Sequence, residues 1–346
     1  MWSEPVARGA TPRATSAARA VCLLGTGHAV PSGVLTSEAV DHRLGLAPGA
    51  IERLSGVRQR PVASRTDTAA RLGAQAARRA LEAAGLGLGD IDCLVAASGT
   101  MDQGMPSNAA LIHRELGLRG VPGFDVNASC LGFIAALDTL SWAVQAGRYR
   151  RVLVVAADIA SCGLDWNHLE ASAIFGDGAA AAVLAPSGDG VGGRILAADL
   201  LTISEGAHLC QIPAGGSRHH PTRIDGAFEP LALFHMDGPR VFKLATRYLP
   251  DFLDRLLGAA GVTLRDIDWV VPHQASRLAM THLSRRLGMG DERVVDIFSD
   301  HGNQIAASLP TALDTAVRDG RIRRGHRLLL LGTGAGLSLG GVVMEF

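Results

Sequence analysis

Cys130 is the residue of this sequence best placed to act as a nucleophile. It lies in the segment Phe124–Phe133, where a predicted strand ends and a predicted helix begins immediately. A thiol at a helix N-terminus is stabilised as a thiolate by the positive end of the helix dipole, which lowers the pKa of the thiol. Small neighbours, Ser129 and Gly132 among them, leave room for a substrate. A buried structural cysteine is the alternative interpretation of the same pattern.

Two polar residues further along the chain stand in similar positions. His273 directly follows a short apolar run, and Asn303 lies in a loop that leads into another predicted helix. Open α/β sheets place their sites at the C-terminal edge of their strands. Either residue alone is more often structural. Together with Cys130 at equivalent edges, they form a much more specific constellation.

The sequence contains an internal repeat. The segment Ala83–Asp92 returns in similar form as Ala259–Asp268, and Ala136–Thr139 returns as Ala312–Thr315, both at the same offset along the chain. A third block, with a Gly-Arg and an Arg-Arg pair, recurs at a slightly shorter offset. Three blocks in the same order indicate two copies of one supersecondary unit.

The repeat also relates the candidate residues to one another. At the offset shared by the first two blocks, Asn303 is the duplicate partner of Asn127, which is close to Cys130. If a pseudo-twofold axis relates the two copies, the helix starts that carry Cys130 and Asn303 meet between the halves.

Helices and strands that alternate in both copies must position these residues. The predicted elements of the first copy are 67–84, 93–97, 131–146 and 152–157, and those of the second copy are 241–260, 269–271, 305–318 and 328–331. Strands without polar alternation are covered on both faces. The predicted fold class is therefore α/β, with helices layered on mixed sheets.

The chain divides into two halves and a tail. We predict a disordered tail over residues 1–18, an N-terminal half over 19–185 with the candidate nucleophile, and a C-terminal half over 186–346 with the histidine and asparagine. The segment around 200–235 is rich in Pro, Gly and His and predicts a long irregular insertion. Long loops on rigid scaffolds often cover sites.

The composition excludes several classes of protein. Hydrophobic residues make up 47% of the chain, charged residues 19%, and the formal net charge is zero, which argues against nucleic acid or an anionic membrane as the main partner. No apolar run reaches the roughly 18 residues of a membrane helix, and residues 1–18 lack the apolar core of a secretory signal. The five cysteines have no zinc-like spacing. We therefore predict reduced thiols, no metal site and a cytoplasmic protein.

Several ordered motifs are similar to those of a known family. Besides the Cys130 turn, they are Gly56–Arg60, Phe175–Gly178, Val271–Ala275, His301–Asn303 and Gly332–Leu337. From about Gly25 to Phe346 the chain resembles the β-ketoacyl-acyl carrier protein synthase III group of thiolase-fold condensing enzymes. The resemblance implies a five-layer αβαβα sandwich built from two duplicated halves.

The resemblance also implies a role for each candidate residue. Cys130 attacks an acyl thioester, and backbone N–H groups of Cys130 and near Ala335 form the oxyanion hole. His273 and Asn303 donate hydrogen bonds to the thioester carbonyl of a malonyl group and stabilise the enolate as carbon dioxide leaves. No tightly bound cofactor is expected. The substrate is a phosphopantetheine thioester on an acyl carrier protein or coenzyme A.

Further residues are expected to line the path of the substrate. By resemblance, the pantetheine arm contacts Gly238, Lys243, Ala275 and Ser276, and the acyl pocket includes Met105, Thr333 and Leu337. Family members are homodimers, and Met105 occupies the position from which a partner subunit closes the acyl pocket. Asp177 is interpreted as part of a buried turn that supports the active-site loops, rather than as a catalytic residue.

The sequence departs from the family where coenzyme A binds. Ala50 and Leu169 stand where a Trp and an Arg clamp the adenine, so the stacking and the charge-assisted contacts are both lost. The other replacements are Pro239 and Ser276 for two asparagines of the pantetheine tunnel, and Thr333 and Ala335 for a Phe and a Gly near the nucleophile. These changes indicate a carrier-protein donor and a reshaped acyl pocket, as in the polyketide-pathway branch of the family.

Two activities remain open at this point. The presence of Asn303 favours decarboxylative condensation, because simple acyl transfer needs no enolate stabilisation. The loss of the coenzyme A clamp and the altered glycine loop favour non-condensing transfer to an alcohol, an amine or a second carrier protein. An inactive scaffold or heterodimer partner is a third alternative, which the presence of all three site residues disfavours.

Overall fold

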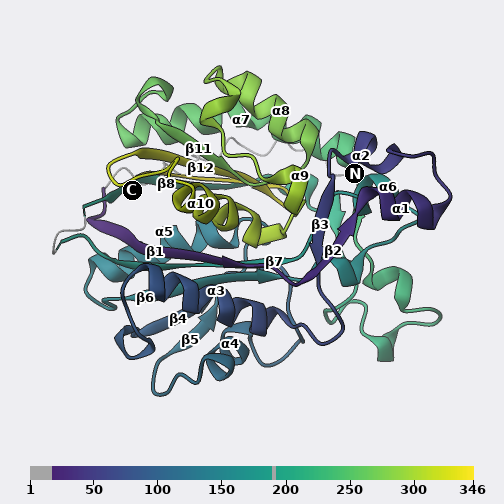
Figure 1. Ribbon diagram of the computed structural model, residues 1–346, viewed down its shortest axis with the longest axis horizontal. Helices are drawn as coiled ribbons and strands as arrows, with labels where there is room; N and C mark the ends of the chain where they lie inside the picture. The colour runs from purple at the N-terminus through teal and green to yellow at the C-terminus, as the bar shows by residue number, and fades with distance from the viewer. Residues whose placement is uncertain (1–17, 189–191) are drawn as a thin grey trace, which may run out of the picture.

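Two sheets with equivalent strand orders form the frame of the molecule (Figure 1). The computed structural model describes residues 18–188 and 192–346. One sheet has the order β1-β7-β6-β4-β5 and the other the order β11-β12-β13-β8. The tail predicted over residues 1–18 lies outside the described residues except for Ala18.

The N-terminal sheet combines parallel and antiparallel pairs. Its strands are β1 (Val21–Ala29), β7 (Gly178–Pro186), β6 (Val152–Asp158), β4 (Cys93–Ala96) and β5 (Gly123–Asp125). β4 pairs in parallel with β5 and β6, whereas β7 pairs antiparallel with β6 and β1. Every residue of β4 and β6 is buried, as expected for strands that are covered on both faces.

The C-terminal sheet repeats this arrangement. Its strands are β11 (Trp269–Pro272), β12 (Arg327–Gly334), β13 (Ser338–Glu345) and β8 (Arg194–Thr202). β11 pairs in parallel with β12, and the pairs β12–β13 and β13–β8 are antiparallel. Each strand thus has the direction of its counterpart in the first sheet. The predicted α/β class with mixed sheets is confirmed.

Helices form three layers around the two sheets (Figure 1). α5 (Gly132–Gln145) and α10 (Ser308–Arg318) lie between the sheets and contact strands of both. The outer layers are α3 (Ala69–Ala83) with α4 (Asn108–Leu116) on the N-terminal sheet and α7 (Gly238–Ala260) with α8 (Arg277–Leu287) on the C-terminal sheet. The five-layer αβαβα sandwich is therefore confirmed.

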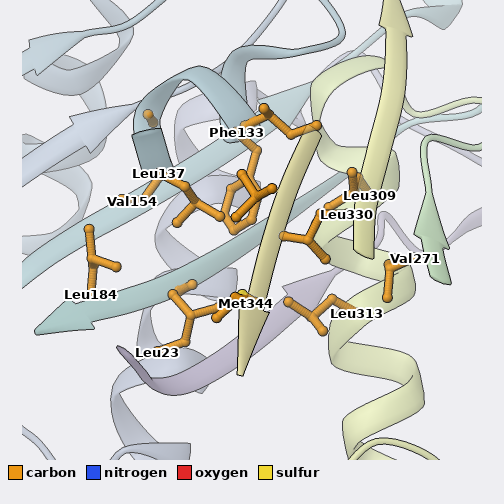
Figure 2. Close-up of a cluster of buried hydrophobic side chains, with 14 of the residues drawn as sticks. Leu23, Phe133, Leu137, Val154, Leu184, Val271, Leu309, Leu313, Leu330 and Met344 are labelled. Carbon is orange, nitrogen blue, oxygen red and sulfur yellow. The ribbon is translucent and has the colours of Figure 1, made fainter. Parts of the chain in front are cut away.

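One large hydrophobic cluster joins the central helices to both sheets (Figure 2). Phe133 and Leu137 of α5 and Leu309 and Leu313 of α10 all belong to it and are at most 2% exposed. Burial of one such side chain stabilises the fold by about 1.5–3 kcal/mol. Because α5 follows the Cys130 turn and α10 follows Asn303, this cluster also holds the two turns in their relative positions.

A smaller group of elements covers one end of the sandwich (Figure 1). It consists of β2 (Gly33–Thr36), β3 (Gln59–Val62), α1 (Ser37–Leu44), α2 (Ala50–Ser55), α6 (Leu169–Ser172) and α9 (Phe298–His301). The buried guanidinium of Arg60 in β3 connects three of these elements, since it donates hydrogen bonds to the Ser37 hydroxyl in α1 and to the carbonyl of Ala173 at the end of α6.

The segment predicted as an irregular insertion starts later and is more ordered than expected. β8 continues to Thr202 because it pairs with β13 over its whole length, so the insertion begins at about residue 203 and not at 200. Within it, β9 (Cys210–Gln211) pairs with β10 (His235–Met236). Its 3₁₀ turns are Ser204–Gly206, Pro221–Arg223 and Glu229–Ala232.

Two predicted helix starts also differ from the structure. α7 begins at Gly238 instead of residue 241, because the Asp237 side chain accepts a hydrogen bond from the N–H of Arg240 and Pro239 suits a first helical turn. The helix predicted over 305–318 begins with a separate 3₁₀ turn, Ile305–Ala307, before α10. The φ angle of Ile305 is 53°, which is incompatible with a continuous right-handed helix.

Candidate active site

The Cys130 turn connects β5 to α5. The side-chain oxygen of Asn127 accepts a hydrogen bond of 2.9 Å from the N–H of Ser129, and Ser129 has a φ angle of 51°. A left-handed conformation at a residue other than glycine costs about 1–3 kcal/mol and persists only where the surroundings impose it. α5 then begins at Gly132, two residues after the cysteine.

The Asn303 turn repeats this geometry in the second copy. The side-chain oxygen of Asn303 accepts a hydrogen bond of 2.8 Å from the N–H of Ile305, whose φ angle of 53° matches that of Ser129. A β-branched residue tolerates this conformation less well than serine does. The duplicated turns therefore share a strained backbone as well as a position in the repeat.

The two turns meet at the loop that follows β4. A Cβ atom on Gly99 would overlap the side chain of Ile305 and lie 3.3 Å from the carbonyl carbon of Ser129. A Cβ atom on Gly132 would overlap the carbonyl oxygen of Ala97 in the same loop. The structure thus brings together the two helix starts that the repeat relates, and glycine allows this close approach.

Substitution of Gly132 by alanine tests this packing. We expect Gly132→Ala to destabilise the protein by about 1–3 kcal/mol, because the Ala97 carbonyl must move to accommodate the methyl group. Gly258→Ala is the matched control, since Gly258 also lies within a helix but its Cβ would meet nothing within 4 Å. The midpoints of urea unfolding measure both effects. Equal midpoints for the two variants would contradict the close packing at Gly132.

His273 follows β11 and faces the same region. Its side chain is 5% exposed, and a Cβ atom on Gly332 would lie 2.9 Å from Leu131 and 3.0 Å from His273. Gly332 of β12 therefore lies between Leu131, which follows Cys130, and His273. The amide nitrogen of Asn303 donates a hydrogen bond of 3.2 Å to the carbonyl of Ala275, two residues after His273.

His273 is neutral at physiological pH. Burial lowers the pKa of its imidazole to about 4. The Nδ1 atom is buried and has no hydrogen-bond partner among the described residues. A neutral imidazole carries one N–H donor, so His273 is suited to donate a hydrogen bond to a substrate carbonyl.

The backbone N–H groups of Cys130 and Ala335 lie near the thiol of Cys130, and both lower the pKa of the thiol. Ala335 lies in the turn between β12 and β13. Two N–H groups directed at one point are the arrangement that stabilises an oxyanion. The two groups assigned to the oxyanion hole by resemblance therefore converge on the sulfur.

The acidity of Cys130 differs from the sequence-based expectation. Burial raises the pKa of its thiol to about 12, and the nearby thiol of Cys210 adds to the rise. Removal of water from the sulfur by the surrounding segments thus outweighs the lowering that the nearby backbone N–H groups provide. Cys210 thus lies in the electrostatic vicinity of the candidate nucleophile.

This high pKa predicts an unusual pH dependence of alkylation. Since only the thiolate reacts, we expect modification of Cys130 by iodoacetamide to rise about tenfold per pH unit from about pH 7 to pH 10. The rate for glutathione, measured in parallel, should level off near its own lower pKa. Quantification of the Cys130 peptide by mass spectrometry gives the rate. A plateau for Cys130 below about pH 9 would contradict the effect of burial.

The segment Phe175–Gly178 supports the Asn303 turn from behind. The N–H of Asn303 donates to the carbonyl of Ile174, and the N–H of Gly176 donates to the carbonyl of Asn303. The carboxylate of Asp177 is fully buried and accepts hydrogen bonds from the N–H of Ala63 and from the N–H and hydroxyl of Ser161. Its position agrees with the interpretation of Asp177 as part of a supporting turn.

A small cavity of about 70 Å³ adjoins His273. Ala275 and Thr333, both singled out in the sequence, line it together with His273. Two helices that the sequence did not link to the site form the rest of the lining. The residues are Phe242, Ala245, Thr246 and Leu249 of α7 and Ala279, Met280, His282 and Leu283 of α8. The spacing of three and four residues along α7 was the available signal, since it places these side chains on one helix face.

The remaining predicted residues lie in different surroundings. Gly238 is the first residue of α7, Lys243 is exposed on the same helix, and Ser276 caps α8 by accepting a hydrogen bond from the N–H of Ala279. Leu337 is buried in the C-terminal core, and Leu339 instead lines the cavity. Met105 is 84% exposed.

A wider hollow of about 640 Å³ lies beside the paired strands β9 and β10. Leu169 and Met236 line it, together with His208, His235 and Arg240. Among residues 18–188 and 192–346, no three His, Cys, Asp or Glu side chains are grouped as a metal site requires. Within the same part of the chain, no helix has the length and hydropathy needed to cross a membrane.

Comparison with known proteins identifies the family. A family model described as 3-oxoacyl-[acyl-carrier-protein (ACP)] synthase III matches residues 124–203, and a model for the C-terminal part of this synthase matches residues 257–346. The β-ketoacyl-[acyl-carrier-protein] synthase III of Neisseria meningitidis serogroup C (strain ATCC 700532) is 36% identical over 323 residues, which cover 93% of this chain and 98% of that protein. The Rhizobium rhizogenes (strain K84) enzyme of the same name is 36% identical over 326 residues, with the same two coverages.

Solved structures agree with these relatives. The crystal structure of 3-oxoacyl-(acyl carrier protein) synthase III from Pseudomonas aeruginosa PAO1 is 32% identical, covers 95% of this chain and 98% of its own, and superposes with a TM-score of 0.84. The enzyme of the same type from Aquifex aeolicus VF5 has the same TM-score at 29% identity. This chain therefore belongs to the β-ketoacyl-[acyl-carrier-protein] synthase III family of thiolase-fold condensing enzymes.

Proposed function

We propose that this enzyme accepts an acyl group on Cys130 and condenses it with a malonyl thioester in a polyketide or other secondary pathway. One observation carries the proposal. His273 and Asn303 are buried side chains that can donate hydrogen bonds, and their segments contact each other and the Cys130 turn, where the N–H groups of Cys130 and Ala335 lie near the thiol. The first pair is suited to an enolate and the second to a tetrahedral oxyanion.

Acyl loading uses the thiol and the two N–H groups. The sulfur of Cys130 attacks the carbonyl carbon of an acyl thioester, and the N–H groups of Cys130 and Ala335 hold the resulting oxyanion. The intermediate collapses with loss of the donor thiol, which leaves with the proton of Cys130. Because the pKa of Cys130 is raised to about 12, we expect this proton to be transferred during the attack and not before it.

Condensation uses His273 and Asn303. Their N–H groups donate to the thioester carbonyl of the malonyl group, where negative charge develops as the bond to the carboxylate breaks and carbon dioxide leaves. The enolate carbon then attacks the acyl carbonyl on Cys130. A carbon–carbon bond forms, the carbon–sulfur bond breaks, and the sulfur of Cys130 recovers a proton from water.

Several residues support a carrier protein as the donor. Ala50 begins α2 and Leu169 lines the wide hollow, and neither side chain offers a ring or a charge to an adenine nucleotide. A carrier protein presents the same pantetheine thioester without that nucleotide. The described cysteines are all free thiols, which fits a reducing cytoplasm.

The test separates loading from condensation. An acyl-carrier-protein thioester is supplied first, and the mass of the intact enzyme reports acylation of Cys130. Malonyl-carrier protein is then added, and carbon dioxide and product mass are measured. Carbon dioxide release with a product longer by two carbons supports condensation, and a parallel series with acyl-coenzyme A compares the donors.

Non-condensing transfer is the second candidate function. The wide hollow beside His208, His235 and Arg240 is large enough for a bulky acceptor. Acylation of Cys130 without release of carbon dioxide, followed by transfer to an added alcohol, amine or second carrier protein, would favour this function. Failure of every donor to acylate Cys130 would reject both functions.

We also infer a homodimer formed through the N-terminal sheet. β5 is the last strand of that sheet, and its Phe124 is 38% exposed. An edge strand offers unpaired backbone groups to a second copy, and the exposed Met105 would then be available to the partner's acyl pocket. Sedimentation analysis should show a dimer that Phe124→Asp weakens, and a monomeric wild type would reject the inference.

A further inference from the structure

Asp158 is a fully buried carboxylate at the end of β6. Its Oδ1 atom accepts hydrogen bonds from the N–H of Gly99 at 2.8 Å, the N–H of Thr100 at 2.7 Å and the hydroxyl of Thr100 at 2.9 Å. Its Oδ2 atom accepts one from the N–H of Ala307 at 3.2 Å. Burial raises the pKa of Asp158 to about 6, so the carboxylate is ionised at neutral pH and above.

The four donors come from both halves of the molecule. Gly99 and Thr100 belong to the loop after β4, where Gly99 is enclosed between Ser129 and Ile305. Ala307 ends the 3₁₀ turn that follows Asn303. Asp158 therefore links the loop beside the Cys130 turn to the turn that orients the Asn303 amide.

The second copy of the repeat has no carboxylate at the position equivalent to Asp158. Cys93 pairs with Val152 in the first sheet and Trp269 pairs with Leu328 in the second, so in these strands the two copies are again related by the offset that relates Asn127 to Asn303. Gly334 is therefore the counterpart of Asp158 in the second copy. A Cβ atom there would lie 3.1 Å from the Cγ of Leu131, and Leu131 is the counterpart of Ala307. In one contact between a strand end and a helix start, Asp158 reaches Ala307 through a hydrogen bond. In the equivalent contact, Gly334 packs directly against Leu131.

We propose that Asp158 is a positioning residue for the condensation step, because it sets the place of the Asn303 amide relative to the acyl group on Cys130. This role rests on the proposed function, since it concerns the step in which the Asn303 amide stabilises an enolate. Asp158 acts on the condensation step through Ala307 and the Asn303 turn, and it contacts no reacting atom. Its charge also contributes to the raised pKa of the Cys130 thiol, so loss of this charge is expected to favour acyl loading and not to slow it.

Substitution of Asp158 by asparagine should disturb its hydrogen bond with Ala307 and preserve those with Gly99 and Thr100. In Asp158→Asn, the amide oxygen of the new side chain is expected to face the three donors of Gly99 and Thr100, because the reverse orientation would place its NH₂ group against all three. The NH₂ group then faces the N–H of Ala307. Two donors repel each other, so the turn after Asn303 moves while the loop beside Cys130 stays in place.

The experiment measures the two chemical steps separately in Asp158→Asn. We expect acylation of Cys130 from the acyl-carrier-protein thioester within about threefold of the wild-type rate, and single-turnover condensation with malonyl-carrier protein slower by about 10–100-fold. Asp314→Asn is the matched control. Asp314 is also buried and accepts hydrogen bonds, from Thr26 and Arg318 among others, but it makes no contact with the two turns and should leave the ratio of the steps unchanged.

A second variant covers the case in which Asp158→Asn fails to fold. Thr100→Val removes the hydroxyl donor to Oδ1 with little change in volume, while the N–H groups of Gly99 and Thr100 still hold the loop beside Cys130. The carboxylate can then shift relative to Ala307, and we expect the ratio of the two steps to change in the same direction by about threefold. Equal slowing of both steps in these variants, or an unchanged ratio, would overturn the role of Asp158. If the wild-type enzyme loads Cys130 but releases no carbon dioxide, the proposed function and the role of Asp158 both fail. If the wild-type enzyme condenses normally and the variants leave the ratio of the two steps unchanged, only the role of Asp158 fails.

Discussion

Replacement of Cys130 by alanine is expected to abolish acyl loading and to reduce product formation by at least about 10³-fold. The reason is that the backbone N–H groups and the Asn303 amide stabilise charge but cannot carry a covalent acyl group, and that an acyl group on the imidazole of His273 would hydrolyse too readily to accumulate. The mass of the intact protein after incubation with the acyl donor measures loading directly. Product formation is followed in the same sample after addition of malonyl-carrier protein.

Cys162→Ala is the control for this substitution. Cys162 is an exposed free thiol outside the converging turns, so its loss should change neither loading nor turnover. Acylation that persists in Cys130→Ala and disappears in Cys162→Ala or Cys210→Ala would place the nucleophile elsewhere. The half-buried Cys210 is the variant to examine first in that case, because its thiol is close enough to influence Cys130.

Replacement of Asn303 by alanine should give the second largest effect, and it should fall on one step only. We expect acyl loading to be nearly unchanged and condensation to slow by about 10²–10³-fold, the usual cost of one donor to a developing oxyanion. Single-turnover measurement of carbon dioxide from pre-acylated enzyme isolates this step from loading.

The internal repeat supplies the control for the Asn303 substitution. Asn127 makes the same hydrogen bond in its own turn as Asn303 does, to the N–H two residues later. Asn127→Ala therefore removes an equivalent support without removing the donor to the enolate. If both variants slow condensation by the same factor, Asn303 acts only as a turn residue and its proposed role in catalysis is wrong.

Local sequence was sufficient to predict most of the frame. The buried runs that became β4, β6, β11 and β12 and the periodic segments that became α3 and α5 were located to within a few residues, because strand and helix formation depend mainly on neighbours in the chain. The repeat went further, since it related Asn127 to Asn303 before any contact was known. Ser129 and Ile305 share one backbone conformation at that same offset.

The least accurate predictions concerned elements whose limits depend on distant partners. β8 extends to Thr202 because β13 lies beside it, and the insertion contains the β9–β10 pair, which joins two segments separated by a long loop. The extra 3₁₀ turn before α10 exists because residues from the other half hold Ile305 in a left-handed conformation. None of these contacts leaves a periodic signal in the chain.

The sequence by itself determined which residues are candidates for chemistry and the kind of fold that presents them. Residue type and a position at the end of a strand or the start of a helix are local properties, and they were enough to select Cys130, His273 and Asn303. Only the tertiary structure decided how acidic the Cys130 thiol is and which carboxylate links the two turns. Acidity depends on the removal of water, and segments far apart in the chain achieve this together. The same holds for Asp158, whose four hydrogen bonds reach residues up to 149 positions away.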